Sequence, residues 1–407
     1  MHKNPIAPIV NLSFMTTANL NIFDRLSNHR GSPTEMLDEM VSHFREARSP
    51  MELFEALKMR IRDQLGLPLV SSENEPSRPE DVERQLEVGL LDACREAGTM
   101  LIEDGRVGEG WMYLRPTGDI ELAKDLISKI EITEDNYEDM IQVLLHEGID
   151  VARGYQAVLD QQGTCNSITL YEQALQNRSK TDQRAAARCL LNHLHSELCE
   201  LVRGDIARRE APAGDDETLA EMIEKRRWIL SDGGYHLDTT HLSSTVRIAT
   251  VLQDEDSLRK AWELTQYGRR LHHQFQYPGD EPFVDFYPAY TTFYAILLGE
   301  NVDAGLKVFE RKARSVDTSE HGTAAVETYV DLLDRTGRHQ EAIDIAIELA
   351  PKDLPPQRIV PSLIEIASRI PETSSQNGWQ SILEYCRKHN DILGYAAVLH
   401  ASGIEAS

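Results

Sequence analysis

Two segments of the chain each place a histidine and a carboxylate at a spacing that fits one face of a helix. His146 and Asp150 are four residues apart, and so are His193 and Glu197. Side chains three or four residues apart on a helix are neighbours. An imidazole beside a carboxylate suits two kinds of chemistry: it ligates a divalent metal such as zinc, or it forms an oriented general base.

A third segment, residues 233–241, has the densest set of such groups. Asp238 and His241 are three residues apart, and Tyr235 and His236 precede them. Asp238 also has a purely structural interpretation, because an aspartate after a Gly-Gly turn is a good helix N-cap. The steps from the first segment to the second and from the second to the third are nearly equal, which indicates one repeating structural unit.

If these segments form stacked hairpins, the sequence predicts that His193 or Glu197 meets a histidine or carboxylate of a neighbouring segment. The candidate catalytic residues are then His146, Asp150, His193 and Glu197. The candidate metal ligands are His146, His193, Glu197, Asp238 and His241. No cofactor is established by these spacings, and a divalent transition metal such as zinc is a hypothesis.

Residues 274–290 contain three prolines and six aromatic residues, which is too apolar for a fully solvated loop. One interpretation is a loop packed on the helices, and the other is a wall over a ligand groove. In the second interpretation, the binding groove combines residues of this stretch with those of the third segment: Tyr235, His236, Asp238, His241, Tyr277, Asp285 and Tyr287.

The elements that must position these residues are helices. From about residue 80 onwards, apolar residues recur at helical spacing, and alternating β-branched runs are scarce, which predicts an all-α fold. The sequence predicts a loose N-terminal arm over 1–30, a helical pair over 31–66, a linker over 67–79 and a helical-repeat domain over 80–402. Residues 207–217 are expected to form an exposed turn.

The stretch 324–353 has the pattern of a helical hairpin. Small residues at Ala325 and Ala342 allow two helices to approach, Gly337 suits the turn between them, and Pro351 ends the unit. This stretch resembles a tetratricopeptide repeat, and the resemblance extends loosely over about 80–400. It implies a helical-hairpin solenoid with a right-handed superhelix and a groove that binds a protein or peptide.

The charge balance of the chain narrows its possible binding partners. The chain has 407 residues, and its 42 basic and 67 acidic residues give a net charge of −25, which disfavours nucleic acid and anionic membrane surfaces. Short basic clusters such as 208–209 and 225–227 are interpreted as solvated helix faces. Five dispersed cysteines indicate reduced thiols and a cytoplasmic protein. Prolines interrupt the first residues, so we expect no signal peptide, and Met15 is an alternative start.

Two functional hypotheses follow. The first is a helical-repeat protein that presents a polar groove, lined by histidines and acids, to a protein or peptide partner. The second is a metal-dependent or acid/base enzyme, hydrolase-like, whose centre lies at the three histidine–carboxylate segments.

Overall fold

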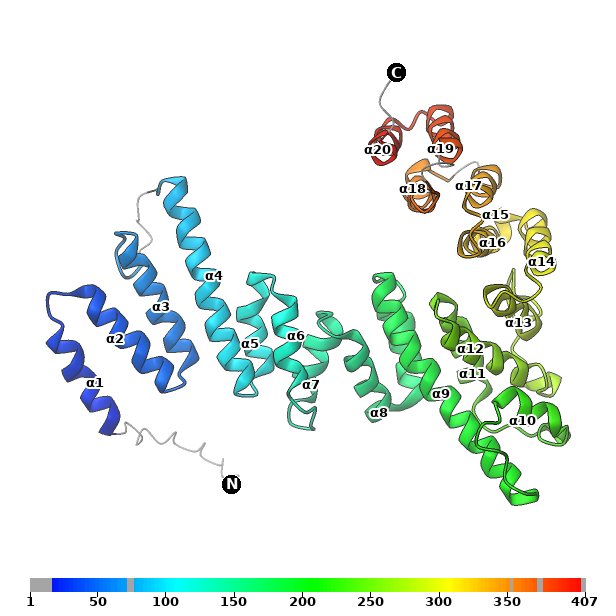
Figure 1. Ribbon diagram of the computed structural model, residues 1–407, viewed down its shortest axis with the longest axis horizontal. Coiled ribbons are helices and arrows are strands. Elements are labelled where there is room, and N and C mark those ends of the chain that lie inside the picture. The colour runs from blue at the N-terminus through cyan, green and yellow to red at the C-terminus, as the bar shows by residue number, and fades with distance from the viewer. Residues whose placement is uncertain (1–16, 72–76, 352–353, 372–375, 404–407) are drawn as a thin grey trace, which may run out of the picture. The chain divides into compact units, whose positions relative to one another are not determined.

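The computed structural model describes residues 17–71, 77–351, 354–371 and 376–403. These residues form 20 α-helices joined by short turns, 3-10 turns and two π-helical turns, and none of them lies in a β-strand (Figure 1). The prediction of an all-α fold is confirmed. Met15 and the rest of 1–16 lie outside the described residues.

The chain divides into two compact units, Met1–Ala157 and Val158–Ser407. The helical elements of the first unit are α1 (Thr17–Asn28), α2 (Pro33–Glu46), α3 (Pro50–Gln64), α4 (Glu80–Glu103), α5 (Val107–Leu114), η1 (Arg115–Thr117), α6 (Ile120–Ser128), α7 (Tyr137–Ile141) and η2 (Gln142–His146). The boundary between the units falls inside α8 (Val151–Leu170).

In the first unit, α2 and α3 form the helical pair predicted for 31–66. Pro33 and Pro50 occupy the first turns of these helices, where a missing N–H costs no hydrogen bond. Gly66 follows α3 with a φ of 67°, a left-handed conformation that ends a helix without strain. Most of the described part of the predicted arm is helical, because α1 packs on α2.

Two glycines let α4 and α5 approach closely. A Cβ atom built on Gly98 would lie 2.9 Å from the carbonyl oxygen of Gly110, and a Cβ on Gly110 would lie 2.9 Å from that of Gly98. Any side chain at either position therefore pushes the helices apart. The contact supports an apolar core around Trp111 that includes Ile102 and Leu114.

The second unit continues α8 and then contains a longer series of helices. Its further elements are η3 (Tyr171–Leu175), α9 (Lys180–Arg209), α10 (Leu219–Lys225), η4 (Ser231–Gly233), α11 (Thr239–Ile248), η5 (Ala249–Val251), α12 (Glu255–Gly268), η6 (His273–Phe275), α13 (Phe286–Leu297), α14 (Val302–Ser315), α15 (Thr318–His321), α16 (Ala324–Arg335), α17 (His339–Glu348), η7 (Pro356–Arg358), α18 (Val360–Ala367), α19 (Gln376–Lys388) and α20 (Ile392–Ser402).

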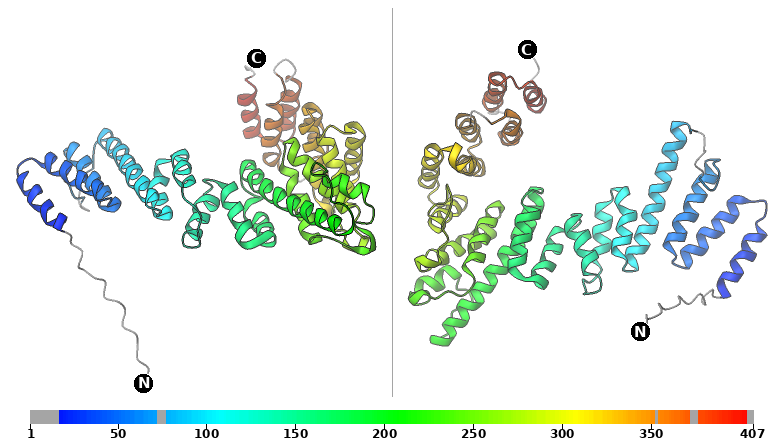
Figure 2. Two further views of the ribbon diagram at one scale, coloured as in Figure 1. Left: turned by 60° about the horizontal axis from the view of Figure 1, so that its bottom comes forward. Right: turned by 180° about the vertical axis from the view of Figure 1, so that it is seen from behind.

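Within the second unit, each helix packs mainly on helices that are close to it in the chain. The long helix α9 contacts α10, α11 and α12, and α12 packs on α13. Further along, α16 packs on α14 and α17, and α19 packs on α17, α18 and α20. The views in Figure 2 show the same succession from α9 to α20.

Local sequence explains where these helices begin. Ser179 caps α9 by accepting a hydrogen bond from the Asp182 amide, and Asp254 caps α12 by accepting one from the Ser257 amide. A capping box opens α10, in which Thr218 and Glu221 each accept the other's backbone N–H.

The hairpin predicted over 324–353 is present as α16 and α17. Ala325 and Ala342 are buried, at 1% and 0% exposure, and Gly337 turns the chain with a φ of 80°. The positive φ explains why the turn needs a glycine, since a Cβ atom is strained in that conformation.

Candidate functional site

The first predicted segment does not form a single helical face. His146 is exposed at the end of η2, and Gly148 then breaks the chain with a φ of 85°. Asp150 instead opens α8, where it accepts a hydrogen bond from the Arg153 amide at 3.2 Å and lies 3.8 Å from Lys124 Nζ. The four-residue spacing of His146 and Asp150 therefore spans a helix break.

In the second segment, the histidine with a buried partner is His195. His193 and Glu197 both lie on α9, where His193 is half-buried and Glu197 is exposed, and no hydrogen bond joins their side chains in the described structure. His195 Nε2 lies 2.7 Å from Oε2 of Glu263 on α12. Both side chains are largely buried, with 15% and 7% exposed.

The charge of His195 is set by this environment. Burial alone would lower the pKa of the imidazole, but contacts with Cys199 and Glu263 outweigh burial and raise the pKa to about 9. The Cys199 sulfur lies 3.8 Å from Nδ1 and 3.9 Å from Nε2 of the ring. We therefore treat His195 as a cation at neutral pH.

In the third segment, Asp238 has the structural role. Its carboxylate caps α11, accepting hydrogen bonds from the Thr240 amide at 2.8 Å and from the Thr240 hydroxyl at 2.6 Å. These bonds lower the pKa of Asp238. His241, in the first turn of α11, is half-buried.

The neighbouring His236, in the turn before α11, is largely buried against α9 and α12. Its Nδ1 lies 2.9 Å from the Tyr267 hydroxyl, and its Nε2 lies 3.6 Å from Asp205. Desolvation lowers the pKa of His236 in spite of the Asp205 carboxylate. These contacts hold the 235–238 turn against α9 and α12.

Of the residues predicted for the groove from 274–290, Tyr277 lies between η6 and α13, Asp285 directly precedes α13 and Tyr287 lies on it. Tyr277 is 42% exposed and makes a T-shaped contact with the Phe286 ring, with ring centroids 5.4 Å apart. Asp285 is exposed at the N-cap position of α13, without a side-chain capping bond. Tyr287 is 1% exposed, and a Cβ on Gly268 would lie 2.1 Å from its ring, so Tyr287 belongs to the core.

A groove does occur in the second unit, but other residues line it. Three pockets, of about 420, 320 and 310 Å³, adjoin in a series: Val251 lines the first and the second, and Glu327 lines the second and the third. We call this series the unit-2 groove; it runs from η3 and α9 past α13 to α16, α17 and α18. None of the seven predicted groove residues lines it.

The middle pocket of the unit-2 groove combines aromatic and charged side chains. Phe283 stacks on Tyr290 with ring centroids 3.9 Å apart. Arg335 lies over the Phe293 ring and donates to the Thr250 carbonyl oxygen at 2.7 Å. These contacts fix one wall of the pocket.

A carboxylate faces this pocket. Enclosure by the pocket walls raises the pKa of Asp331, and Arg335, 3.4 Å away, offsets this only in part. The side chain is nevertheless 52% exposed, so water and ligands reach it within a concave surface. Asp331 is therefore placed to accept a hydrogen bond from a bound partner.

The pocket nearest the C-terminus is mainly apolar. Its walls come from α16, α17 and α18 and include the side chains of Val326, Val330, Leu363 and Ile366. Glu327 and Arg358 add opposite charges to its lining. Such a lining fits apolar side chains that are flanked by polar backbone.

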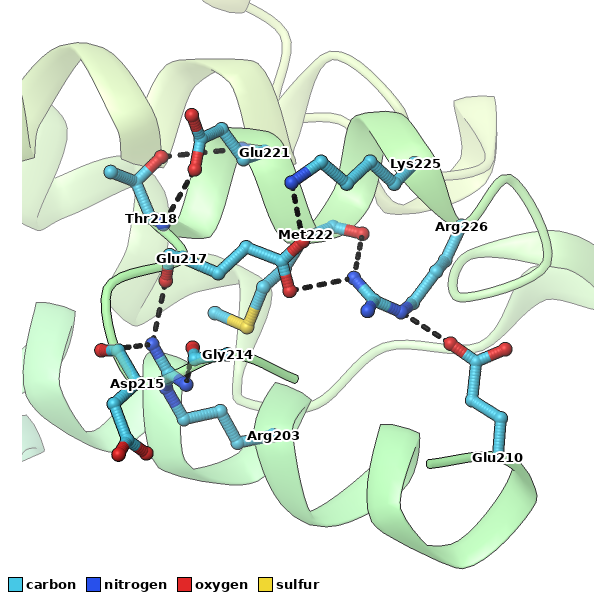
Figure 3. Close-up of polar contacts among 10 residues, drawn as sticks. All are labelled: Arg203, Glu210, Gly214, Asp215, Glu217, Thr218, Glu221, Met222, Lys225 and Arg226. Carbon is cyan, nitrogen blue, oxygen red and sulfur yellow. Dashed lines mark hydrogen bonds and ion pairs between the residues drawn. The ribbon is translucent and has the colours of Figure 1, made fainter. Parts of the chain in front are cut away.

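A separate polar network ties down the turn predicted over 207–217. Arg203 donates to the carbonyl oxygens of Gly214 at 2.7 Å and of Glu217 at 2.6 Å (Figure 3). The Glu217 carboxylate, 8% exposed, accepts from Lys225 at 2.6 Å and from Arg226 at 3.0 Å. The basic cluster 225–227 is thus partly engaged in ion pairs.

The described residues show neither a cluster of metal-ligating side chains nor a helix that could span a membrane. Across those ranges, no three histidine, cysteine, aspartate or glutamate side chains gather closely enough to hold a metal ion. None of the helices there combines the length and the apolarity that crossing a bilayer requires. Comparisons with models of known protein families, with curated proteins and with solved structures found no match.

Proposed function

We propose that this chain is a helical-repeat scaffold, a tetratricopeptide-like solenoid, that binds a peptide or a segment of a partner protein in the unit-2 groove. The observation that carries the proposal is the continuity of three pockets across helices α9, α13 and α16–α18. A groove of this length suits an extended segment better than a small molecule, which needs one enclosed pocket.

Two further observations support the repeat class. The α16–α17 hairpin has two buried alanines, Ala325 and Ala342, and a glycine turn. Successive helices pack on near neighbours in the chain, as in arrays whose repeats contact only adjacent repeats. The right-handed superhelix implied by the resemblance is part of this proposal.

The lining suggests the chemistry of the partner. The apolar pocket takes one or two aliphatic or aromatic side chains of the bound segment. In the middle pocket, Asp331 accepts from a backbone N–H or a polar side chain, and the exposed Lys180 at the mouth of this pocket pairs with an acidic one. The predicted enzymatic alternative, with a metal or acid/base centre, stays a prediction.

Selection from a displayed peptide library on the purified full-length chain tests the proposal. Enriched peptides are then titrated against Ser362→Trp, which fills the apolar pocket from an exposed position on α18. We expect this variant to weaken binding by at least about tenfold, because the indole occupies the volume that the peptide needs. Fluorescence anisotropy measures the affinity.

Ser368→Trp is the matched control, because Ser368 is exposed at the end of the same helix and lies outside the groove. It should bind as the unmodified chain does. Failure to enrich any peptide, or equal binding by Ser362→Trp, would contradict the proposal.

A further inference from the structure

A pocket outside the unit-2 groove is lined by arginines, although the chain as a whole is acidic. It measures about 400 Å³ and lies between the end of α10 and the end of α12. Its charged lining residues are Arg226, Arg227 and Arg270, and no carboxylate lines it among the described residues. The whole chain carries 67 acidic and only 42 basic residues, so three arginines in one pocket run against its overall charge balance.

Helix ends explain part of this pattern. The three arginines follow the C-termini of α10 and α12, where positive charge stabilises the negative end of the helix dipole. That effect needs a cation near each helix end, but it does not require the arginines to line one shared pocket.

Two of the arginines are held in place by the fold. Arg226 donates through Nη1 to Glu217 at 3.0 Å and through Nε to Glu210, as Figure 3 shows. Arg270 donates through Nη1 to the Ile223 carbonyl oxygen at the end of α10. Fixed guanidinium groups lose little conformational entropy when they bind an anion.

Each of the three arginines keeps N–H groups that are available to a ligand. A guanidinium has five N–H donors. The Nη2 group of Arg226 and the Nε and Nη2 groups of Arg270 have no acceptor among the described residues. Arg227 is exposed and has no side-chain partner in the described structure.

We propose that this arginine pocket binds the phosphate group of a small organic phosphate. The charges of Arg227 and Arg270, which pair with no carboxylate among the described residues, match a doubly charged phosphate better than a singly charged carboxylate. Arg226, whose charge is offset by Glu210 and Glu217, adds its Nη2 donor to the phosphate oxygens. The aliphatic side chains of Ile223, Ile229 and Leu230 also line the pocket and provide a surface for the organic part of the ligand. The site is independent of the proposed groove.

Isothermal titration of the full-length chain with inorganic pyrophosphate at low salt tests the site. We expect saturable binding of one pyrophosphate per chain that weakens as salt is added. Arg227→Ala should weaken it by at least about tenfold, because one charge-assisted contact is lost. Arg227 has no described structural partner, so this variant is expected to fold normally.

Two further variants are titrated: Arg270→Lys tests the geometry of the pocket, and Arg311→Ala is the control. Arg270→Lys keeps the charge but loses the forked geometry, and it should weaken binding several-fold. Arg311 is an exposed arginine on α14, outside the pocket, and Arg311→Ala should bind pyrophosphate normally. The absence of saturable binding, unchanged binding by Arg227→Ala, or an equal loss in Arg311→Ala would overturn the proposal.

The source of the phosphate is decided by a second measurement. Vesicles of phosphatidylcholine, with and without a phosphoinositide, are sedimented with the chain. Arg227-dependent sedimentation with the phosphoinositide assigns the pocket to a lipid headgroup. Pyrophosphate binding without such sedimentation assigns it to a soluble phosphate.

Discussion

His195 on α9 and Glu263 on α12 form a largely buried pair, with Nε2 and Oε2 2.7 Å apart. The two residues are 68 positions apart in the chain, so the pair joins two helices that are not consecutive. Because the folded environment raises the pKa of His195 to about 9, this contact links protonation to the stability of the second unit.

The first prediction is a loss of stability at alkaline pH that depends on His195. The pKa is 6.5 in the unfolded chain and about 9 in the folded one, so the stabilisation is complete below pH 6.5 and is lost as the pH rises through 9. The stabilisation that protonated His195 contributes is at most about 3 kcal/mol. Urea unfolding across this range should show the decline in the unmodified chain and a flatter profile in His195→Gln.

His193→Gln is the control for this experiment, since His193 is two residues earlier on α9 and has no described partner. It should keep the decline of the unmodified chain. The same decline in His195→Gln would show that another group is responsible.

The second prediction contrasts two buried tyrosines of α13. The Tyr287 hydroxyl has no hydrogen-bond partner among the described residues, whereas the Tyr294 hydroxyl donates to the Val246 carbonyl oxygen at 2.6 Å. Tyr287→Phe should stabilise the protein by about 1 kcal/mol, because it removes a buried unpaired group. Tyr294→Phe should destabilise it by about 1 kcal/mol or more. Chemical denaturation measures both, and destabilisation by Tyr287→Phe would reveal a partner for that hydroxyl.

The third prediction concerns two helical glycines with opposite surroundings. A Cβ on Gly110 would lie 2.5 Å from Ile102 Cγ1, so Gly110→Ala should destabilise the first unit by about 1–3 kcal/mol through overpacking. Gly204, inside α9, has nothing within 4 Å of such an atom, so Gly204→Ala should stabilise by about 0.5–1 kcal/mol. Melting temperatures that shift in the same direction would contradict this.

The fourth prediction is that Arg203 holds the 210–217 turn. Arg203→Met keeps the aliphatic stem but removes the donors to the carbonyl oxygens of Gly214, Asp215 and Glu217. We expect faster cleavage in this turn by a glutamate-specific protease, because the freed backbone samples open conformations. Arg208→Met, a change at a 73% exposed side chain at the end of the same helix, should be cleaved at the normal rate.

Local sequence determined the class of fold. Helical spacing of apolar residues, prolines at first turns and glycines at helix ends act within a few residues, so α2, α3 and the α16–α17 hairpin were predictable from the sequence. Local sequence also predicted one of the two interpretations of Asp238, the helix N-cap that the structure has. His195 also had a local signal, since it lies four residues after Leu191 and three before Leu198 on the buried side of α9.

Only the tertiary structure decided which partner each histidine meets. Glu263 reaches His195 and Asp205 reaches His236 because α9 packs against α12 and the turn that precedes α11, and no spacing along the chain encodes that packing. Gly148 separates His146 from Asp150 for a local reason, but the unit-2 groove arises from side chains of distant helices. Pairings between helices depend on how their apolar faces fit together, and that fit is a property of the folded chain rather than of any one segment.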